Sequence, residues 1–405
     1  MPVLTNIGYL ATCRDEGGQG DIHPVKKAAI VWKDGTIRWV GHMSELPVTY
    51  RDEKEYDAGG NMVIPGLVDS HTHLAFGGWR PDEFAMRVGG ASYLNIAEEG
   101  GGILSTVKAT REASEDELFG KAADFLKQMV KLGVTTVECK SGYGLSIEDE
   151  LKTLHVYRRL SEEQPLNIVA TFLGAHTIPS EYEDDRSSYI DLVINEMIPQ
   201  IAGEELAEFC DVFAEQSAFS VTESRRILNA GKEMGLTPKL HADQLTSCGG
   251  AELAAEVEAV SADHLEKISG TGIERMAEAG VIGVTLPLAS LYTQEKPLNC
   301  RKLVESGVEV AVATDFNPGS APSYNLPLAM MLACNQSQLT PAEALKGATI
   351  YGAKAILRDH KVGSIEKGKR ADFVVIDATN PNFWMYHFRT NGSQQVFVKG
   401  MKQKD

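Results

Sequence analysis

Long apolar runs are missing from this sequence of 405 residues, in which a stretch such as residues 281–289 is far too short to span a bilayer. Residues 1–18 lack the basic start and the apolar run of a secretory signal. Basic residues are scarce, because 39 Lys and Arg stand against 56 Asp and Glu, for a formal net charge of −17. This charge disfavours nucleic acid and anionic membranes as partners, and we expect a cytoplasmic protein.

Closely spaced cysteines are also missing, because the six cysteines are scattered and form no CxxC pair. Neither a disulfide framework nor a structural zinc site is therefore indicated, and reduced thiols are the default expectation. The apolar content of 43% and the charged content of 23% are typical of a globular protein. A chain of this length can form a barrel-sized core together with a small second domain.

The chain contains two kinds of sequence. Residues 1–67 and 361–405 consist of short strands and turns, and we expect them to join in one small β-sandwich domain. In residues 68–360, apolar strands alternate with amphipathic helices. Such alternation is typical of a parallel sheet that is covered by helices.

The α/β part is predicted to be a (β/α)8 barrel. Its clearest helix covers residues 114–133 and begins with a capping box formed by Ser114 and Glu117. One or two further strands between His73 and residue 114 would bring the number of strands to eight. The strand candidates that follow the first strand are residues 134–139, 168–174, 236–242, 258–264, 281–286 and 308–315.

Histidines and an aspartate lie where predicted strands end, and in a barrel these ends form the face that carries active sites. The first strand runs into His71-Thr72-His73, whose i, i+2 spacing on an extended chain points both imidazoles to one side. Three further strands end in His241, His264 and Asp315. Each could be a hydrogen-bonded core residue or a helix cap, but their gathering at one face favours a metal site.

Several segments resemble the amidohydrolase superfamily over the whole chain. They are VIPGLVDSHTH, the HADQ and SADHLE strand ends, ATDFNPGS, and the closing VGSIEKGKRADFVVID. Within the superfamily, FGGWRPDEFAMR at residues 76–87, ECKSGYGL at 138–145 and FLGAHTIP at 172–179 resemble the imidazolonepropionase family. The HTH and RADFVV pieces alone would indicate only the superfamily.

The resemblance implies one divalent metal ion with an open position for water. Some relatives hold two metals bridged by a carboxylated lysine at the end of the fourth strand. Counting back from Asp315 on the eighth strand makes residues 168–176 the fourth, and this segment contains no lysine. Lys140 falls one strand earlier and is interpreted as structural, or as positioning the turn that follows it. Zinc is favoured, with iron as the alternative, and the implied ligands are His71, His73, His241 and Asp315.

The resemblance further implies hydrolysis of the cyclic amide of 4-imidazolone-5-propanoate to N-formimidoyl-L-glutamate. His264 would act as general base, Asp315 would pass the proton to the departing nitrogen, and the metal or His176 would stabilise the oxyanion. Arg80 offers a planar, two-pronged donor for the propionate. The other residues implied to contact the substrate are Tyr93, Tyr143, His176, Gln244, Asn317, Gly319 and Ser320.

One position departs from many related deaminases. They carry a proton-shuttling glutamate three residues after the fifth-strand histidine, whereas this chain has Gln244, which cannot titrate. This argues against a deaminase mechanism, unless Asp243 substitutes for the glutamate. A deaminase and a metal-free barrel without catalysis stay open as alternatives. The implied partners are a small-molecule substrate and, as an option, a second copy in a homodimer.

Overall fold

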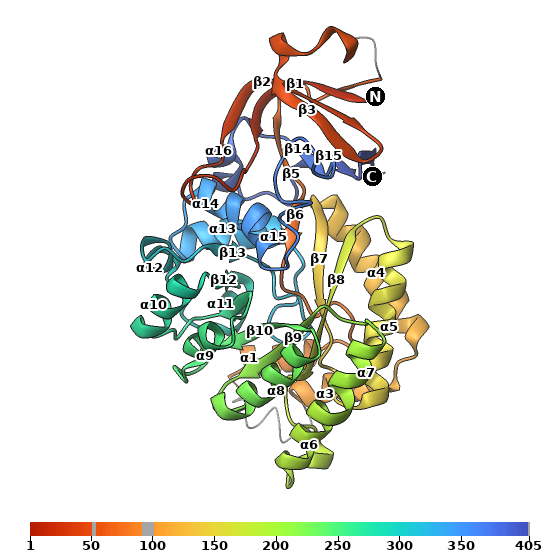
Figure 1. The fold of residues 1–405 in the computed structure, drawn as a ribbon, viewed down its shortest axis with the longest axis vertical. Helices are drawn as coiled ribbons and strands as arrows, with labels where there is room; N and C mark the ends of the chain where they lie inside the picture. Colours follow the sequence, from red (N-terminus) through yellow and green to blue (C-terminus); the bar gives the residue numbers. More distant parts are fainter. Residues whose placement is uncertain (51–53, 91–100, 404–405) are drawn as a thin grey trace.

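The computed structural model describes residues 1–50, 54–90 and 101–403, which form a barrel and a smaller sheet (Figure 1). Both chain ends lie in the smaller sheet, at the top of the view, where the first and last segments of the chain run side by side. We propose the boundaries predicted above, residues 1–67 with 361–405 against 68–360, as the division between the two parts.

The smaller sheet is mixed, and its strands are β1 (Val3–Ala11), β2 (Pro24–Lys33), β3 (Thr36–His42), β4 (Glu55–Asp57), β5 (Met62–Pro65), β14 (Phe373–Ile376), β15 (Ser393–Val398) and β16 (Met401–Lys402). The order is β16-β15-β14-β5-β1-β2-β3, with β4 paired to β1. Trp32 of β2 packs edge-on against Phe373 and Phe397 of the distant strands β14 and β15, at ring-centroid distances of 5.1 and 5.6 Å. The predicted sandwich is therefore one hydrogen-bonded sheet that curls around an aromatic core.

The barrel has eight parallel strands that follow one another in chain order. They are β6 (Leu67–Asp69), β7 (Val134–Lys140), β8 (Asn167–Ala175), β9 (Phe209–Ala214), β10 (Thr237–Ala242), β11 (Ser261–His264), β12 (Ile282–Thr285) and β13 (Val310–Val312). Strands β13 and β6 are joined beyond their carboxyl ends, where Asp315 N donates to His71 O at 3.0 Å and His73 N donates to Phe316 O at 2.9 Å. The predicted barrel is confirmed, and it closes at residues that were expected to bind metal.

The predicted strand positions were wrong in one place. The strand that completes the barrel is β9, and the further strands expected between His73 and residue 114 are not formed by the described residues there, which contain α1 (Pro81–Val88) and α3 (Ile103–Glu112). Strand β9 escaped the prediction because Asp211 lies in its middle and interrupts the apolar pattern.

With β9 as the fourth barrel strand, Lys140 and His176 each lie one strand earlier in the barrel than predicted or counted, and a single metal ion is still expected. Lys140 ends the second barrel strand, and His176 follows the third. The fourth strand, β9, has the sequence FCDVFA and contains no lysine. The chain therefore still lacks the lysine at the fourth strand that would bridge two metal ions.

The helices surround the barrel as predicted. The expected helix is α4 (Glu115–Lys131), whose capping box of Ser114 and Glu117 is present. The same box is formed by Ser220 and Glu223 before α8 and by Thr340 and Glu343 before α14. The remaining α-helices of the described residues are α5 (Ile147–Glu163), α6 (Arg186–Leu192), α7 (Ile198–Gly203), α8 (Val221–Glu233), α9 (Gly250–Glu256), α10 (Gly270–Ala279), α11 (Pro287–Thr293), α12 (Cys300–Glu305), α13 (Leu326–Gln336), α14 (Pro341–Lys346), α15 (Gly352–Lys354) and α16 (Pro381–Tyr386).

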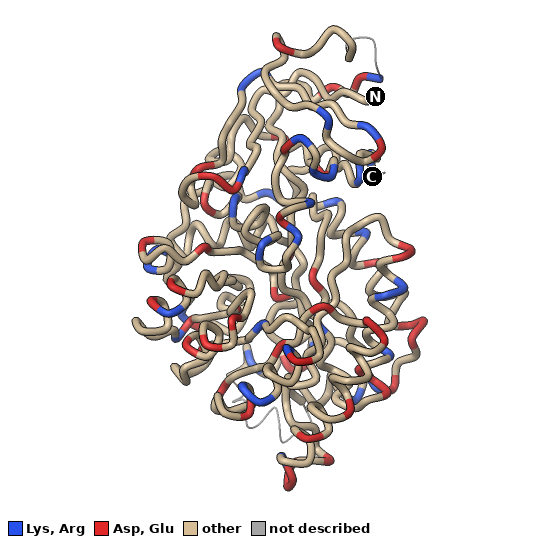
Figure 2. The backbone as a smooth tube through the Cα atoms, in the orientation of Figure 1, with Lys and Arg blue, Asp and Glu red and all other residues tan. Residues whose placement is uncertain are grey.

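Among the described residues, no helix combines the length and the apolar character needed to cross a bilayer. Acidic and basic residues are interspersed along both parts of the chain (Figure 2).

Candidate active site

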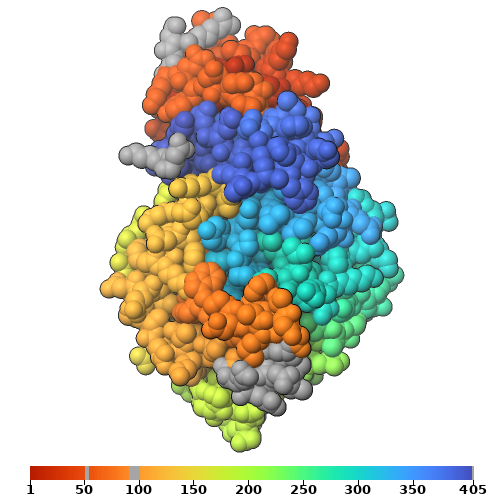
Figure 3. All heavy atoms as spheres, turned by 180° about the vertical axis from the view of Figure 1, so that it is seen from behind, coloured from red at the N-terminus to blue at the C-terminus, as the bar shows by residue number. Residues whose placement is uncertain are grey.

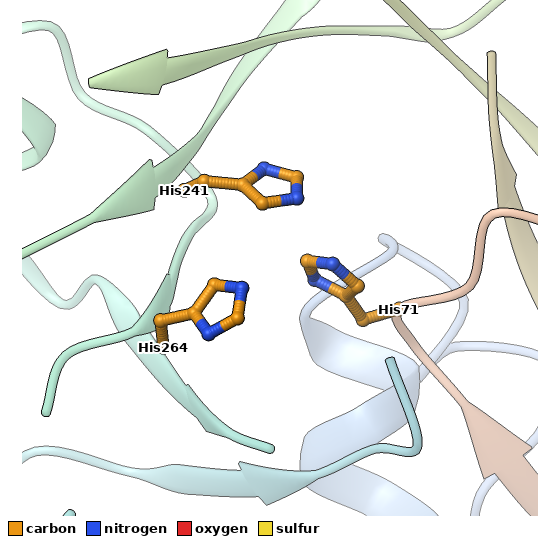
Figure 4. Close-up of side chains that lie close together, drawn as sticks. All are labelled: His71, His241 and His264. Atoms are coloured by element: carbon orange, nitrogen blue, oxygen red, sulfur yellow. The ribbon is translucent and has the colours of Figure 1, made fainter. Parts of the chain in front are cut away.

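Four histidines and one aspartate meet at the carboxyl ends of the barrel strands. Figure 4 shows the imidazoles of His71, His241 and His264 pointing towards one another from three different strands or strand ends. The possible ligand atoms of these three lie within 4.8 Å of one another, and so do those of His71, His73 and Asp315. All five side chains are buried.

Short contacts link the four predicted ligands into one set. His71 Nε2 lies 3.4 Å and His73 Nε2 lies 3.5 Å from Asp315 Oδ1. His241 Nε2 lies 3.4 Å from His73 Nε2. Ligand atoms about 2.1 Å from a tetrahedral ion are about 3.4 Å apart, so these three contacts match three of the six edges of such a site. The residues present therefore fit a metal ion, and His264 lies beside this set.

Two buried carboxylates orient the ligands. Asp263 Oδ2 lies 2.6 Å from His71 Nδ1, and Asp211 Oδ2 lies 3.0 Å from His241 Nδ1. Lys140 Nζ lies 2.8 Å from Asp211 Oδ2 and 3.6 Å from Asp263 Oδ2. Carboxylates in this position fix the tautomer and the orientation of metal-binding imidazoles. Lys140 thus places one positive charge beside the two orienting carboxylates and offsets part of their charge, a more specific role than the structural one predicted.

The backbone of the site is strained at two of its members. His264 has a φ of 78° and Asp315 a φ of 56°, both in the left-handed region that residues with a side chain rarely adopt. Such conformations persist only where the surrounding structure enforces them, and they gather at functional sites. Here they turn two side chains inward where their strands end.

The site holds an unusual distribution of protons. Burial lowers the pKa of His241 to about 3 and also lowers that of His73. Burial acts in the same direction on His71, but its contacts with Asp263 and Asp315 outweigh this effect and raise its pKa to about 9. Burial raises the pKa of Asp315, yet its contacts with His71 and His73 hold it well below the usual range. Without metal, His71 is therefore an imidazolium between two carboxylates.

His176 lies next to the predicted ligands, and its tautomer can be deduced. Its ring stacks on that of His73 at a centroid distance of 5.0 Å, and its Nδ1 lies 3.1 Å from the carbonyl oxygen of Gly142. Because a carbonyl only accepts, Nδ1 carries the proton. Burial, with His73 and His241 nearby, holds the pKa of His176 well below its usual range. Its Nε2 is therefore an acceptor, which does not suit the predicted role as oxyanion donor.

The turn after β13 is held together by its own side chains. Asn317 Nδ2 donates to the Asp315 carbonyl at 2.6 Å and to Ser320 Oγ at 2.9 Å. Asn317 Oδ1 accepts from the backbone N–H groups of Gly319 and Ser320 at 2.8 and 2.7 Å. The amide of Asn317 therefore shapes the turn, and Ser320 Oγ lies 3.4 Å from Asp315 Oδ2.

Two further predicted residues lie beside the site. The ring of Tyr143 is buried at centroid distances of 5.7 Å from His73 and 5.3 Å from His176. Burial and the charge of Asp315 raise the pKa of Tyr143, and the positive charge of Arg80 opposes this rise. A cavity of about 440 Å³ opens beside Arg80 and is lined by Trp79, Phe84 and Tyr292, among other residues.

The loop after β10 shows why Asp243 does not replace the proton-shuttling glutamate of related deaminases. Asp243 is buried, and its carboxylate accepts from the backbone N–H groups of Cys248, Gly249, Gly250 and Ala251 at 2.8 to 3.2 Å. It therefore caps α9 and cannot replace a proton-shuttling glutamate. Gln244, the next residue, is partly exposed. Tyr93 lies outside the residues that the structure describes.

Comparison with known proteins agrees with this geometry. The amidohydrolase family model matches residues 62–402. An imidazolonepropionase of Geobacillus kaustophilus is 49% identical over 386 residues, which cover 94% of this chain and 91% of that protein. An imidazolonepropionase of Fusobacterium nucleatum is 46% identical over 403 residues, which cover 98% of this chain and 97% of that protein. The chain belongs to the imidazolonepropionase family of amidohydrolases. It is therefore a hydrolase, and the catalytically inactive alternative is not supported.

Solved structures share the fold at lower identity. The guanine deaminase of E. coli has a TM-score of 0.75 at 16% identity, with 100% of this chain and 99% of that chain covered. An adenosine deaminase of Xanthomonas campestris with bound zinc has a TM-score of 0.74 at 17% identity, with 99% and 92% covered. These likenesses show the barrel architecture alone, since the identity is low.

Proposed function

We propose that the chain hydrolyses 4-imidazolone-5-propanoate to N-formimidoyl-L-glutamate. Water adds to the ring carbonyl, the amide C–N bond breaks, and the departing ring nitrogen takes up a proton. The observation that carries this proposal is the set of 3.4–3.5 Å contacts joining His71, His73, His241 and Asp315 beside Arg80. The relatives named imidazolonepropionase support the choice of substrate.

One divalent ion would be held by these four side chains, with zinc favoured and iron as the alternative. When bound, such an ion lowers the pKa of a water molecule towards neutrality and stabilises negative charge on an oxygen. The buried Asp211 and Asp263 would keep the ligand rings in place. A homodimer remains a prediction from the family resemblance.

His264 is proposed to take the proton from the attacking water. Its ring lies at centroid distances of 5.7 Å from His71 and 5.5 Å from His241, close enough to reach a water molecule at the centre of the site. Glu266 Oε2 lies 3.7 Å from His264 Nδ1. The proton would then pass through Asp315, which adjoins the other ligands, to the departing nitrogen.

The substrate would be oriented by one hydrogen-bond acceptor and one cationic donor. Nε2 of His176 accepts a hydrogen bond and therefore suits an N–H of the imidazolone ring. Arg80 suits the propionate because a guanidinium binds a carboxylate in two-pronged fashion. Tyr143, Ser320, Gln244 and Tyr93 remain predicted contacts of the substrate.

The experiment uses metal-loaded protein with 4-imidazolone-5-propanoate, and mass spectrometry detects N-formimidoyl-glutamate. We expect product with the wild type and none with His241→Ala, which removes a ligand. His155→Ala is the matched control, since this partly exposed histidine of α5 pairs with Glu204 and is none of the predicted site residues. Absence of product from protein that holds one equivalent of metal would rule out the proposed reaction.

A further inference from the structure

We infer that Glu83 is a positioning residue for Arg80: it holds one edge of the guanidinium and leaves Nη1 to bind the carboxylate of the substrate. This inference rests on the proposed function, in which Arg80 binds the propionate. It assigns a role in substrate specificity to an acidic side chain outside the metal centre.

Two nitrogens of the guanidinium donate to one oxygen of Glu83. Glu83 Oε2 accepts from Arg80 Nε at 2.9 Å and from Arg80 Nη2 at 2.6 Å. The side chains are only 12% and 16% exposed, so the pair is better shielded from water than an ordinary surface ion pair. A guanidinium is planar, so fixing two nitrogens fixes the direction of the third.

Glu83 is itself anchored from a second helix. Its other oxygen, Oε1, accepts from the backbone N–H of Gly102 at 3.0 Å and from Ser105 Oγ at 3.1 Å. These donors lie at the start of α3, whereas Glu83 lies in the first turn of α1. Burial raises the pKa of Glu83, but its contacts with Arg80 prevail and lower it, so the carboxylate is ionised. A pair that served only the first turn of α1 would not need this anchor.

Gly319 limits the guanidinium from the opposite side. A Cβ atom at this position would lie 2.3 Å from Arg80 Nη1, so a side chain here would displace the guanidinium. The glycine is therefore explained by the close approach of Arg80. Nη1 is thereby directed at the turn after β13, which carries Asp315 and Ser320.

The surroundings of Arg80 leave room for a ligand. The cavity of about 440 Å³ adjoins it, and the ring of Phe84 stacks on that of Tyr292 at 5.4 Å. This contact joins α1 to α11, and in Figure 3 the orange segment that includes α1 lies against the green and cyan part of the barrel. Arg80 thus lines an open space that lies beside this contact.

Three variants test the inference. Glu83→Gln keeps the shape of the side chain and removes its charge, Arg80→Ala removes the guanidinium, and Asp82→Asn is the control. Asp82 is an exposed acid in the same first turn of α1, so this control removes an equal charge from the same helix end. The measurements are KM, kcat, metal content, and the binding of 3-(imidazol-4-yl)propanoate and its neutral amide as unreactive probes.

For Glu83→Gln we expect KM about tenfold higher and kcat within about twofold of the wild type, because ground-state and transition-state binding lose the same contact. The carboxylate probe should bind about tenfold more weakly, and the amide probe should bind as before. Metal content should not change. Asp82→Asn should match the wild type in every measurement.

The possible failures can be told apart. If Arg80→Ala loses the preference for the carboxylate probe and Glu83→Gln keeps it, the inference about Glu83 is wrong and the proposed function stands. If Arg80→Ala also keeps the preference, the proposed role of Arg80 fails. If Glu83→Gln weakens both probes equally or loses metal, Glu83 is architectural. Should Glu83→Gln not fold, Gly319→Ala displaces the guanidinium from the other side and should give the same loss of preference.

Discussion

Asp263 Oδ2 lies 2.6 Å from His71 Nδ1, and both side chains are fully buried. A carboxylate at this nitrogen turns the ring so that Nε2 faces the other metal-binding side chains. Asp211 stands in the same relation to His241, at 3.0 Å from its Nδ1. Two of the three predicted histidine ligands are therefore oriented by an acid from a different strand.

The first prediction concerns Asp263→Asn, which keeps the size of the side chain and removes its charge. We expect the affinity for zinc to fall about 10- to 100-fold, because the imidazole loses basicity and a fixed orientation. The measurement is a zinc titration of metal-free protein against a competing chelator above pH 9, where no proton on His71 competes with the ion. Asp191→Asn is the control, since Asp191 is exposed and pairs with Arg226. An unchanged affinity in the Asp263 variant would show that the contact is irrelevant to metal binding.

The second prediction concerns pH. In the metal-free protein, the acidic partners raise the pKa of His71 to about 9, so the ring is protonated below that pH. An ion can bind only after this proton leaves, since an imidazolium has no free lone pair. Affinity should therefore fall about tenfold for each unit that the pH drops below 9, and it should level off above 9.

Calorimetry in buffers with different ionisation enthalpies checks this directly. About one proton should be released from His71 per ion bound near neutral pH. Asp263→Asn should lower that number, because the contact that raises the pKa of His71 is weakened. The same proton release in both proteins would contradict the assignment of the proton to His71.

The third prediction separates stability from chemistry at Asp243. Its carboxylate accepts from four backbone N–H groups at 2.8 to 3.2 Å and caps α9. Asp243→Ala should lower the free energy of unfolding by on the order of 3 kcal/mol, because buried donors lose a charged acceptor. Urea unfolding measures this loss, and Asp243→Asn should lose less. If the folded Asp243→Asn enzyme lost all activity while keeping its metal, Asp243 would have a role in the reaction besides capping α9.

The candidate metal centre could be predicted largely because its members are marked locally. His71 and His73 share one face through their spacing, and His241 and His264 end apolar strands. The barrel topology then brings strand ends together, whatever the distances along the chain. The structure bears out the gathering of these side chains at one face.

The features that could not be predicted from the sequence depend on contacts between residues that are distant along the chain. Asp211 interrupts an apolar pattern and hides strand β9, and its burial makes sense only beside Lys140 of β7 and His241 of β10. The desolvation penalty of a buried charge is offset by a charged side chain that lies close to it in the fold. The sequence does not show which side chain that is. Asp243 is ambiguous for the same reason, because only the loop geometry shows that its acceptors are already used.

The last prediction concerns the proton on His176. Its Nδ1 faces a carbonyl, and its pKa lies well below the usual range, so the neutral ring accepts at Nε2. Gln can place an acceptor oxygen near Nε2, whereas Phe cannot. We therefore expect His176→Gln to keep about tenfold more kcat/KM than His176→Phe. The ratio of wild-type to His176→Gln activity should be constant between about pH 6 and 8, because no proton on His176 is gained or lost there. If the cation were required as a donor, wild-type activity would fall relative to the variant as the pH rises, and the accepting role would be wrong.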